Sequence, residues 1–143
     1  MEYILLLTAC INPDGMPFTC LADVGVRKKQ YIEALNFYLK NTTRKIVFVE
    51  NSGTDISSSF KDFQHRIEFL CFDGNLCFDK RKGKGYGEAL ILEYAMAKSE
   101  FITDDVLIFK LTGRLQLINI NRLIHYMDKL SPSKNFVCVV PPQ

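Results

Sequence analysis

The stretch "YILLLTACI", residues 3–11, decides the fold class of this 143-residue chain. Its continuous apolar run is typical of a strand covered on both faces, whereas a strand with one face in water alternates apolar and polar residues. Strands covered on both faces belong to parallel sheets flanked by helices. Similar runs recur along the chain, namely "KIVFVE" (45–50), "IEFLCF" (67–72), "VLIFK" (106–110) and "NFVCVV" (135–140). The sequence therefore predicts a mostly parallel sheet.

Helical periodicity fills the gaps between these runs. Apolar residues at helical spacing predict helices over about residues 26–39, 86–98 and 115–130. A shorter helix is expected through Phe60 and Phe63, capped by Thr54 or Asp55. Alternation of strand and helix predicts an α/β sandwich, and the length fits a single domain over residues 1–143.

Composition excludes several classes of protein. A content of 48% hydrophobic and 24% charged residues is ordinary for a globular protein, and a net charge of +2 is too small to indicate nucleic-acid binding. No apolar run approaches the roughly 18 residues that a membrane span requires. The opening "MEYILLLTACI" has an acidic residue near its start and no basic segment, which argues against a secretory signal.

Cysteine and histidine usage indicates neither a disulfide framework nor a metal site. The five cysteines are odd in number and form no CxxC pair, and the two histidines give no zinc spacing. We expect reduced, mostly buried thiols in a cytoplasmic protein.

Polar, turn-forming residues follow the first four predicted strands. Because the carboxyl ends of parallel strands share one edge of a sheet, where ligands bind in this fold class, these segments predict a binding site. They are Thr8, Asn12 and Pro13, then residues 50–53, residues 73–75 and residues 110–114.

The segment "KRKGKGYGEA", residues 80–89, enters a predicted helix through alternating glycines. Such glycines allow a phosphate to approach backbone amides at a helix N-terminus, and Lys82 and Lys84 would add positive charge. Its spacing fits neither a P-loop nor a dinucleotide fingerprint, and a flexible basic loop explains it equally well. Glu88 is expected to interact with the dipole of the helix from its first turn.

The order of these motifs resembles bacterial glycosyltransferases with the GT-A fold, in particular a group that serves surface-polysaccharide or lipopolysaccharide synthesis. The resemblance covers roughly residues 3–125, and "ENSG" (50–53) and "KLTGR" (110–114) are its most specific pieces. It implies a Rossmann-like sandwich that binds a nucleotide-sugar donor. Base and ribose would be held by Thr8, Pro13, Glu50, Asn51 and Ser52, and the ribose–phosphate region by Arg27, Gly83, Lys84 and Gly85.

The sequence departs from the family pattern where many GT-A enzymes carry a metal-binding Asp-x-Asp. Those positions read Lys110-Leu111-Thr112, and Asp104 and Asp105 precede the strand, where a turn is expected. Lysine does not bind Mg²⁺, so no metal or other cofactor is predicted. Instead, Lys110 and Arg114 are predicted to offset the charge that develops on the leaving diphosphate.

Simpler interpretations of the same residues remain open. Lys110 can extend from the strand end into solvent, and Arg114 can pair with a carboxylate. Thr112 either bonds a sugar hydroxyl or shapes the turn, and Gly113 is expected to serve backbone geometry.

The resemblance implies a saccharide or lipid-linked acceptor and no nucleic acid. The basic residues 27–29 agree with peripheral association at the inner face of the cell membrane. No general base is evident. The acceptor-binding half of the family would follow the fifth strand, where this sequence stops at "VCVVPPQ", so a fragment or an unusually short acceptor side is expected.

Two other functions stay open at this point. The first is a non-catalytic nucleotide-binding remnant or interaction module of the same fold. The second is a methyltransferase that uses a nucleoside cofactor, which the missing glycine-rich turn after the first strand disfavours.

Overall fold

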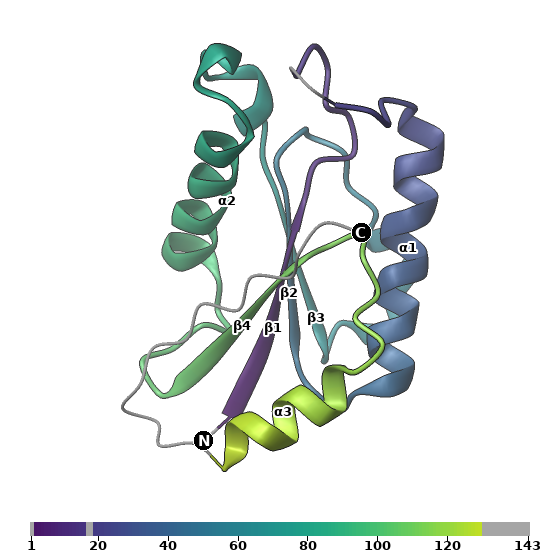
Figure 1. Cartoon of the computed structure of the whole chain (residues 1–143), viewed down its shortest axis with the longest axis vertical. Helices are drawn as coiled ribbons and strands as arrows, with labels where there is room; N and C mark the ends of the chain where they lie inside the picture. The colour runs from purple at the N-terminus through teal and green to yellow at the C-terminus, as the bar shows by residue number, and fades with distance from the viewer. Residues whose placement is uncertain (1, 17–18, 130–143) are drawn as a thin grey trace.

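The structure, a computed structural model, describes residues 2–16 and 19–129. Within these residues, four strands form one parallel sheet in the order β3-β2-β1-β4 (Figure 1). They are β1 (Glu2–Ala9), β2 (Ile46–Glu50), β3 (Ile67–Cys71) and β4 (Val106–Thr112). The predicted parallel α/β architecture is thereby confirmed, while the strand expected at residues 135–140 lies outside the described residues.

Two helices cover opposite faces of the sheet (Figure 1). Helix α1 (Val24–Asn41) packs against one apolar cluster, which includes Leu5 and Leu7, and α2 (Lys84–Lys98) packs against another, which includes Ile4 and Leu6. Successive residues of β1 therefore enter different cores, because side chains alternate across a strand. Continuous apolarity in residues 3–11 follows directly from this burial on both faces.

The short helical segments of the structure differ in detail from those expected from the sequence. The segment around Phe60 is a 3₁₀ helix, η1 (Ser57–Phe63). Asp55 Oδ1 accepts a hydrogen bond from Ser57 N at 2.8 Å before it, whereas Thr54 uses its backbone amide to bond Glu50. Two further 3₁₀ turns, η2 (Gly74–Leu76) and η3 (Lys80–Lys82), lie in the loop between β3 and α2.

Helix α3 (Ile120–Asp128) begins five residues later than the apolar pattern predicts. The cause is Tyr38 of α1, whose hydroxyl donates to Leu115 O at 2.7 Å and accepts from Leu117 N at 3.0 Å. The first bond occupies the carbonyl of Leu115, which a helix starting there would use internally, and the second holds the amide of Leu117 against α1. The prediction of a helix from residue 115 was therefore wrong at its start.

The strand order reverses at β1. The chain passes from β1 through α1 to β2 on one side, and from β3 through α2 to β4 on the other side of β1. In doubly wound sheets, the space beyond the carboxyl ends of strands at such a switch point is where ligands bind. Over residues 2–16 and 19–129, no helix has the length and apolarity needed to cross a bilayer.

Candidate functional site at the carboxyl ends of the strands

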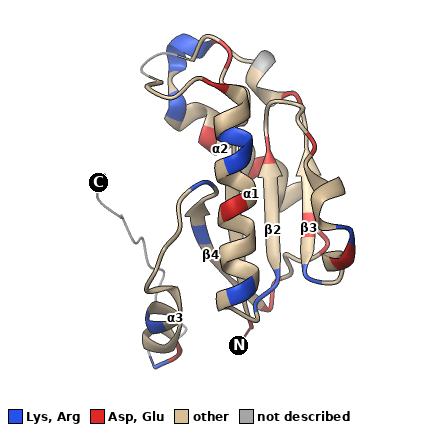
Figure 2. Cartoon of the chain, turned by 90° about the vertical axis from the view of Figure 1, so that its right-hand side faces the viewer, with Lys and Arg blue, Asp and Glu red and all other residues tan. Residues whose placement is uncertain are grey.

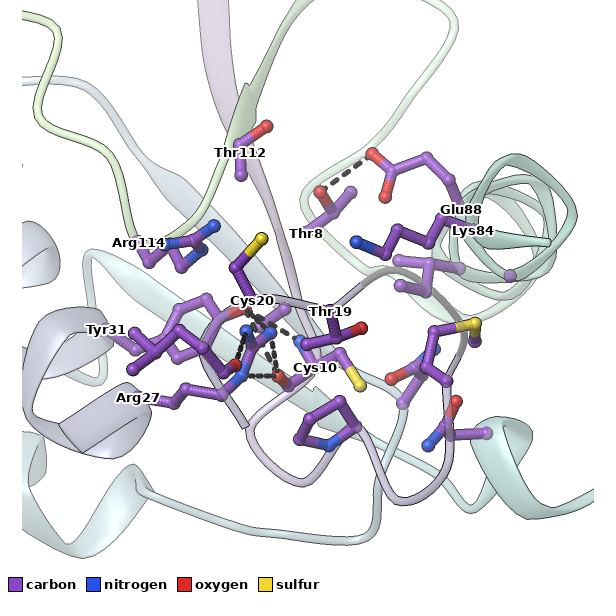
Figure 3. Close-up of a pocket in the computed structure, with 18 residues that line it drawn as sticks. Thr8, Cys10, Thr19, Cys20, Arg27, Tyr31, Lys84, Glu88, Thr112 and Arg114 are labelled. Atoms are coloured by element: carbon purple, nitrogen blue, oxygen red, sulfur yellow. Dashed lines mark hydrogen bonds between the residues drawn. The ribbon is translucent and has the colours of Figure 1, made fainter. Parts of the chain in front are cut away.

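A pocket of about 390 Å³ lies beyond the ends of β1 and β4, at the switch point (Figure 3). That volume falls within the range of small-molecule sites. Helices α1 and α2 contribute residues from their N-terminal halves, and the ends of β1 and β4 and the loops after all four strands supply the rest. The predicted site residues that line it are Thr8, Pro13, Arg27, Asn51, Lys84, Thr112 and Arg114.

Glu50 lies behind the pocket, where its carboxylate links the loops that form the pocket wall. Its side chain is buried, and Oε1 accepts from Ile11 N at 2.9 Å and from the Ser52 hydroxyl. Oε2 accepts from Ser52 N at 3.0 Å and from Thr54 N at 2.8 Å. Ser52 Oγ in turn accepts from Asn12 N at 2.9 Å. Neither Glu50 nor Ser52 lines the pocket, so the structure gives both a role in loop geometry.

Arg27 joins the start of α1 to the loop after β1. Its guanidinium is buried and donates through Nε to Cys10 O at 2.9 Å and through Nη1 to Leu21 O at 3.0 Å. Tyr31, one turn further along α1, accepts from Cys10 N at 3.0 Å, and burial raises the pKa of its hydroxyl. The neutral carbonyl partners leave the positive charge of Arg27 in the pocket wall.

Two cysteines line the pocket, a feature that the sequence did not indicate. Burial raises the pKa of the Cys10 thiol to about 11. Cys20 is exposed, as is Cys77 near the start of α2, so the expectation of mostly buried thiols was wrong for these two. Loop residues carry no periodicity, and for that reason their burial could not be predicted.

Glu88 faces the pocket from α2 and contacts two strands. Because α2 starts at Lys84, Glu88 lies beyond the first turn, and the expected interaction with the helix dipole is wrong. Its Oε1 accepts from Thr8 Oγ1 at 2.8 Å and pairs with the ammonium of Lys110 (Figure 3 shows the Thr8 bond). Lys110 itself does not line the pocket. Its charge is instead used to hold a carboxylate at the pocket rim.

The glycine-rich segment contributes less than its spacing indicates. Gly83 has φ +84° and separates η3 from α2, while Gly85 is exposed, and neither lines the pocket. Gly87 does line it and is buried, with the Phe78 ring 3.1 Å from where a Cβ would be. Lys84, Gly87 and Glu88 are therefore the members of this segment that line the pocket.

Gly113 lets β4 approach β1 closely enough to place Arg114 in the pocket. Its amide donates to Thr8 O at 2.8 Å, and a Cβ there would be 2.7 Å from that same oxygen. Arg114 follows directly and lines the pocket. Within the described residues, no carboxylate pairs with Arg114 or with Arg27.

Charges outside the pocket are more evenly balanced. Figure 2 shows basic residues gathered toward the end of the molecule where α2 begins, with acidic residues among them. Arg81 pairs with Asp79 at 2.8 Å, and Lys29 approaches Glu33 at 3.9 Å. The basic clusters noted in the sequence are thus partly neutralised. By contrast, no described carboxylate neutralises the guanidinium groups of Arg27 and Arg114 inside the pocket.

The pocket wall also contains buried oxygens that have no hydrogen-bond partner in the described part of the chain. They are Thr19 Oγ1, Asn51 Oδ1 and Asn75 Oδ1. A buried acceptor without a donor is costly, so such atoms mark places where a water molecule or a ligand would supply the bond.

Replacing Gly113 with alanine is expected to destabilise the protein by about 1–3 kcal/mol, because the new methyl group meets backbone rather than a flexible side chain. Urea denaturation measures the loss. Gly85→Ala is the matched control: it lies in α2 with no atom within 4 Å of the added Cβ, and should be neutral or stabilising. Equal stability of the two variants would contradict the close-approach role of Gly113.

No protein-family model, curated protein or solved structure matches this chain. The site must therefore be interpreted from its own geometry. Among the side chains described, no group of three or more His, Cys, Asp or Glu residues is arranged to hold a metal ion.

Proposed function

We propose that the pocket binds a nucleoside diphosphate sugar and that the protein is a glycosyltransferase of the GT-A type. The acceptor would be a saccharide or a lipid-linked saccharide. The observation that carries the proposal is a pair of guanidinium groups, Arg27 and Arg114, which line a pocket at the switch point and have no carboxylate partner among the described residues.

Positive charge in a partly buried wall is unfavourable unless an anion neutralises it. Guanidinium groups form forked, charge-assisted hydrogen bonds with phosphate oxygens. Arg114 makes no hydrogen bond with another described residue and suits this role, whereas Arg27 donates through all three nitrogens to the protein and contributes its charge. Arg27 and Arg114 approach the cavity from α1 and from the segment after β4, and Lys84 lines it from the first turn of α2 (Figure 3). Three cations from three elements suit a ligand with more than one phosphate. The unpartnered oxygens of Asn51 and Asn75 suit the N–H groups of a nucleobase.

The same charges support transfer chemistry. As the bond between the sugar and the diphosphate breaks, its electron pair moves to a phosphate oxygen, and fixed cations stabilise that oxygen without a divalent metal. The proposal assigns this role to Arg114, with Lys84 contributing positive charge from the α2 side of the pocket (Figure 3). Lys110, which the sequence pattern favoured for this role, acts instead as the counter-ion of Glu88.

Thermal stabilisation by UDP, GDP, CDP, ADP and CMP, each with and without EDTA, tests the proposal. We expect one nucleoside diphosphate to raise the melting temperature by the same amount in both conditions, because ligands that bind only the folded state stabilise it. A shift that requires Mg²⁺ would refute the metal-independent mechanism. Absence of any shift would refute nucleotide binding altogether.

A non-catalytic binding module would share this pocket. It is favoured by the composition of the described pocket lining, which has no histidine and a single carboxylate, already ion-paired. Release of free sugar or transfer to an acceptor, measured with the nucleotide sugar whose base gives the shift, separates the two functions.

A further inference from the structure

We infer that Glu88 accepts hydrogen bonds from hydroxyl groups of a sugar ring in the bound ligand. The ring is either the ribose of the nucleotide or the sugar to be transferred. This inference rests on the proposed function and specifies how the site recognises an uncharged part of its substrate.

The first argument is electrostatic. Glu88 is the one acidic side chain among the described residues that line a pocket otherwise supplied with cations. A carboxylate attracts phosphate groups less than a cation does, even when it is ion-paired, so the diphosphate is expected nearer the guanidinium groups than the carboxylate of Glu88. The ligand atoms beside Glu88 must then be neutral hydrogen-bond donors. Hydroxyl groups are the donors that a nucleotide sugar carries in greatest number.

The second argument is geometric. Thr8 and Lys110 both bond to Oε1 of Glu88, and Thr8 is almost completely buried. These contacts fix the side chain in position before a ligand arrives. Both of these contacts are made to Oε1, although an ionised carboxylate accepts through both oxygens. With its side chain 35% exposed and lining the pocket, Glu88 can accept further hydrogen bonds from a ligand there.

The third argument concerns selectivity. Hydrogen bonds from hydroxyls to a carboxylate are stronger than those between neutral groups, and dinucleotide-binding folds use an acidic residue, at another place in the fold, to bond ribose hydroxyls. A preoriented carboxylate therefore distinguishes a ribose from a deoxyribose, or one sugar from another. The cations cannot make this distinction, because every nucleoside diphosphate carries the same phosphates.

Titration calorimetry tests the inference with whichever nucleoside diphosphate stabilises the wild type most, its 2′-deoxy and 3′-deoxy forms, and its glucose ester. The test variant is Glu88→Gln. Glu93→Gln is the matched control, because it removes a carboxylate from an exposed position of the same helix that does not line the pocket. Melting curves establish that each variant is folded. If Glu88→Gln is not, Glu88→Asp replaces it, since it keeps the charge and withdraws the oxygens by one methylene.

If the ribose is the partner, the wild type should bind the ribonucleotide more tightly than at least one deoxy form. Glu88→Gln should then weaken ribonucleotide binding about 10- to 100-fold and remove that preference. If the transferred sugar is the partner, the loss should be confined to the glucose ester.

Unchanged affinity of Glu88→Gln for every ligand would overturn the inference and leave the proposed function intact. Tighter binding by Glu88→Gln would also overturn it, because the carboxylate would then only repel the diphosphate. Failure of the wild type to bind any nucleoside diphosphate would overturn the proposed function, and this inference with it.

Discussion

Replacing Glu50 with alanine is expected to lower the free energy of unfolding by about 4 kcal/mol, with urea denaturation as the measurement. The side chain is buried and accepts hydrogen bonds from the backbone amides of Ile11, Ser52 and Thr54. Alanine would leave these donors without partners in a place that water reaches poorly, and each unsatisfied group costs about 1–3 kcal/mol. It would also open a cavity beside the sheet.

Two further substitutions make this result specific. Glu50→Gln keeps one acceptor oxygen but turns an amide NH₂ toward N–H donors, so an intermediate loss is expected. Glu33→Ala removes an exposed carboxylate of α1 whose nearest cation, Lys29, is itself exposed, and should change stability by less than about 0.5 kcal/mol. A loss at Glu50→Ala no larger than that of Glu33→Ala would show that the loops do not depend on this carboxylate.

Arg114→Ala is expected to weaken nucleoside diphosphate binding about 100-fold while leaving stability almost unchanged. The affinity falls because a charge-assisted, forked contact to phosphate is lost, worth about 3 kcal/mol. Stability is retained because Arg114 forms no ion pair or hydrogen bond with any other described residue. Calorimetric titration measures the first quantity and thermal melting the second.

Comparison with three other variants locates the effect. Arg114→Lys keeps the charge without the fork and should give an intermediate affinity. Arg122→Ala removes an exposed arginine of α3, outside the pocket, and should bind like the wild type. Lys110→Ala should weaken binding less than Arg114→Ala, because Lys110 acts only through Glu88. A larger effect at Lys110 than at Arg114 would restore the role that the sequence pattern suggested.

The sheet was predictable because its cause is local in the sequence. Residues 3–11 are apolar at every position except Thr8, and burial on both faces accounts for that pattern. Parallel strands then require their polar carboxyl ends to share one edge, which is how Thr8, Asn51, Thr112 and Arg114 come to one pocket.

Other features depend on contacts between distant segments and leave no local signal. Whether Lys110 enters the pocket depends on which residue of α2 lies opposite it, and that residue is Glu88. The late start of α3 depends on the hydroxyl of Tyr38, which competes for backbone groups in a segment of helical periodicity. The contact of Lys110 with Glu88 and that of Tyr38 with the segment before α3 follow from no regular spacing of residues in the sequence.

The central position of β1 has a consequence for how the protein forms during translation. Of the four described strands, β1 is synthesised first. One of its edges pairs with β4, which follows more than one hundred residues later, since Glu2 lies opposite Val106. At typical elongation rates that edge stays open for roughly 5 to 20 s, and an open apolar edge is prone to aggregate. The pocket exists only once β4 has docked, so a ligand that binds it recognises the completed sheet and no earlier folding intermediate.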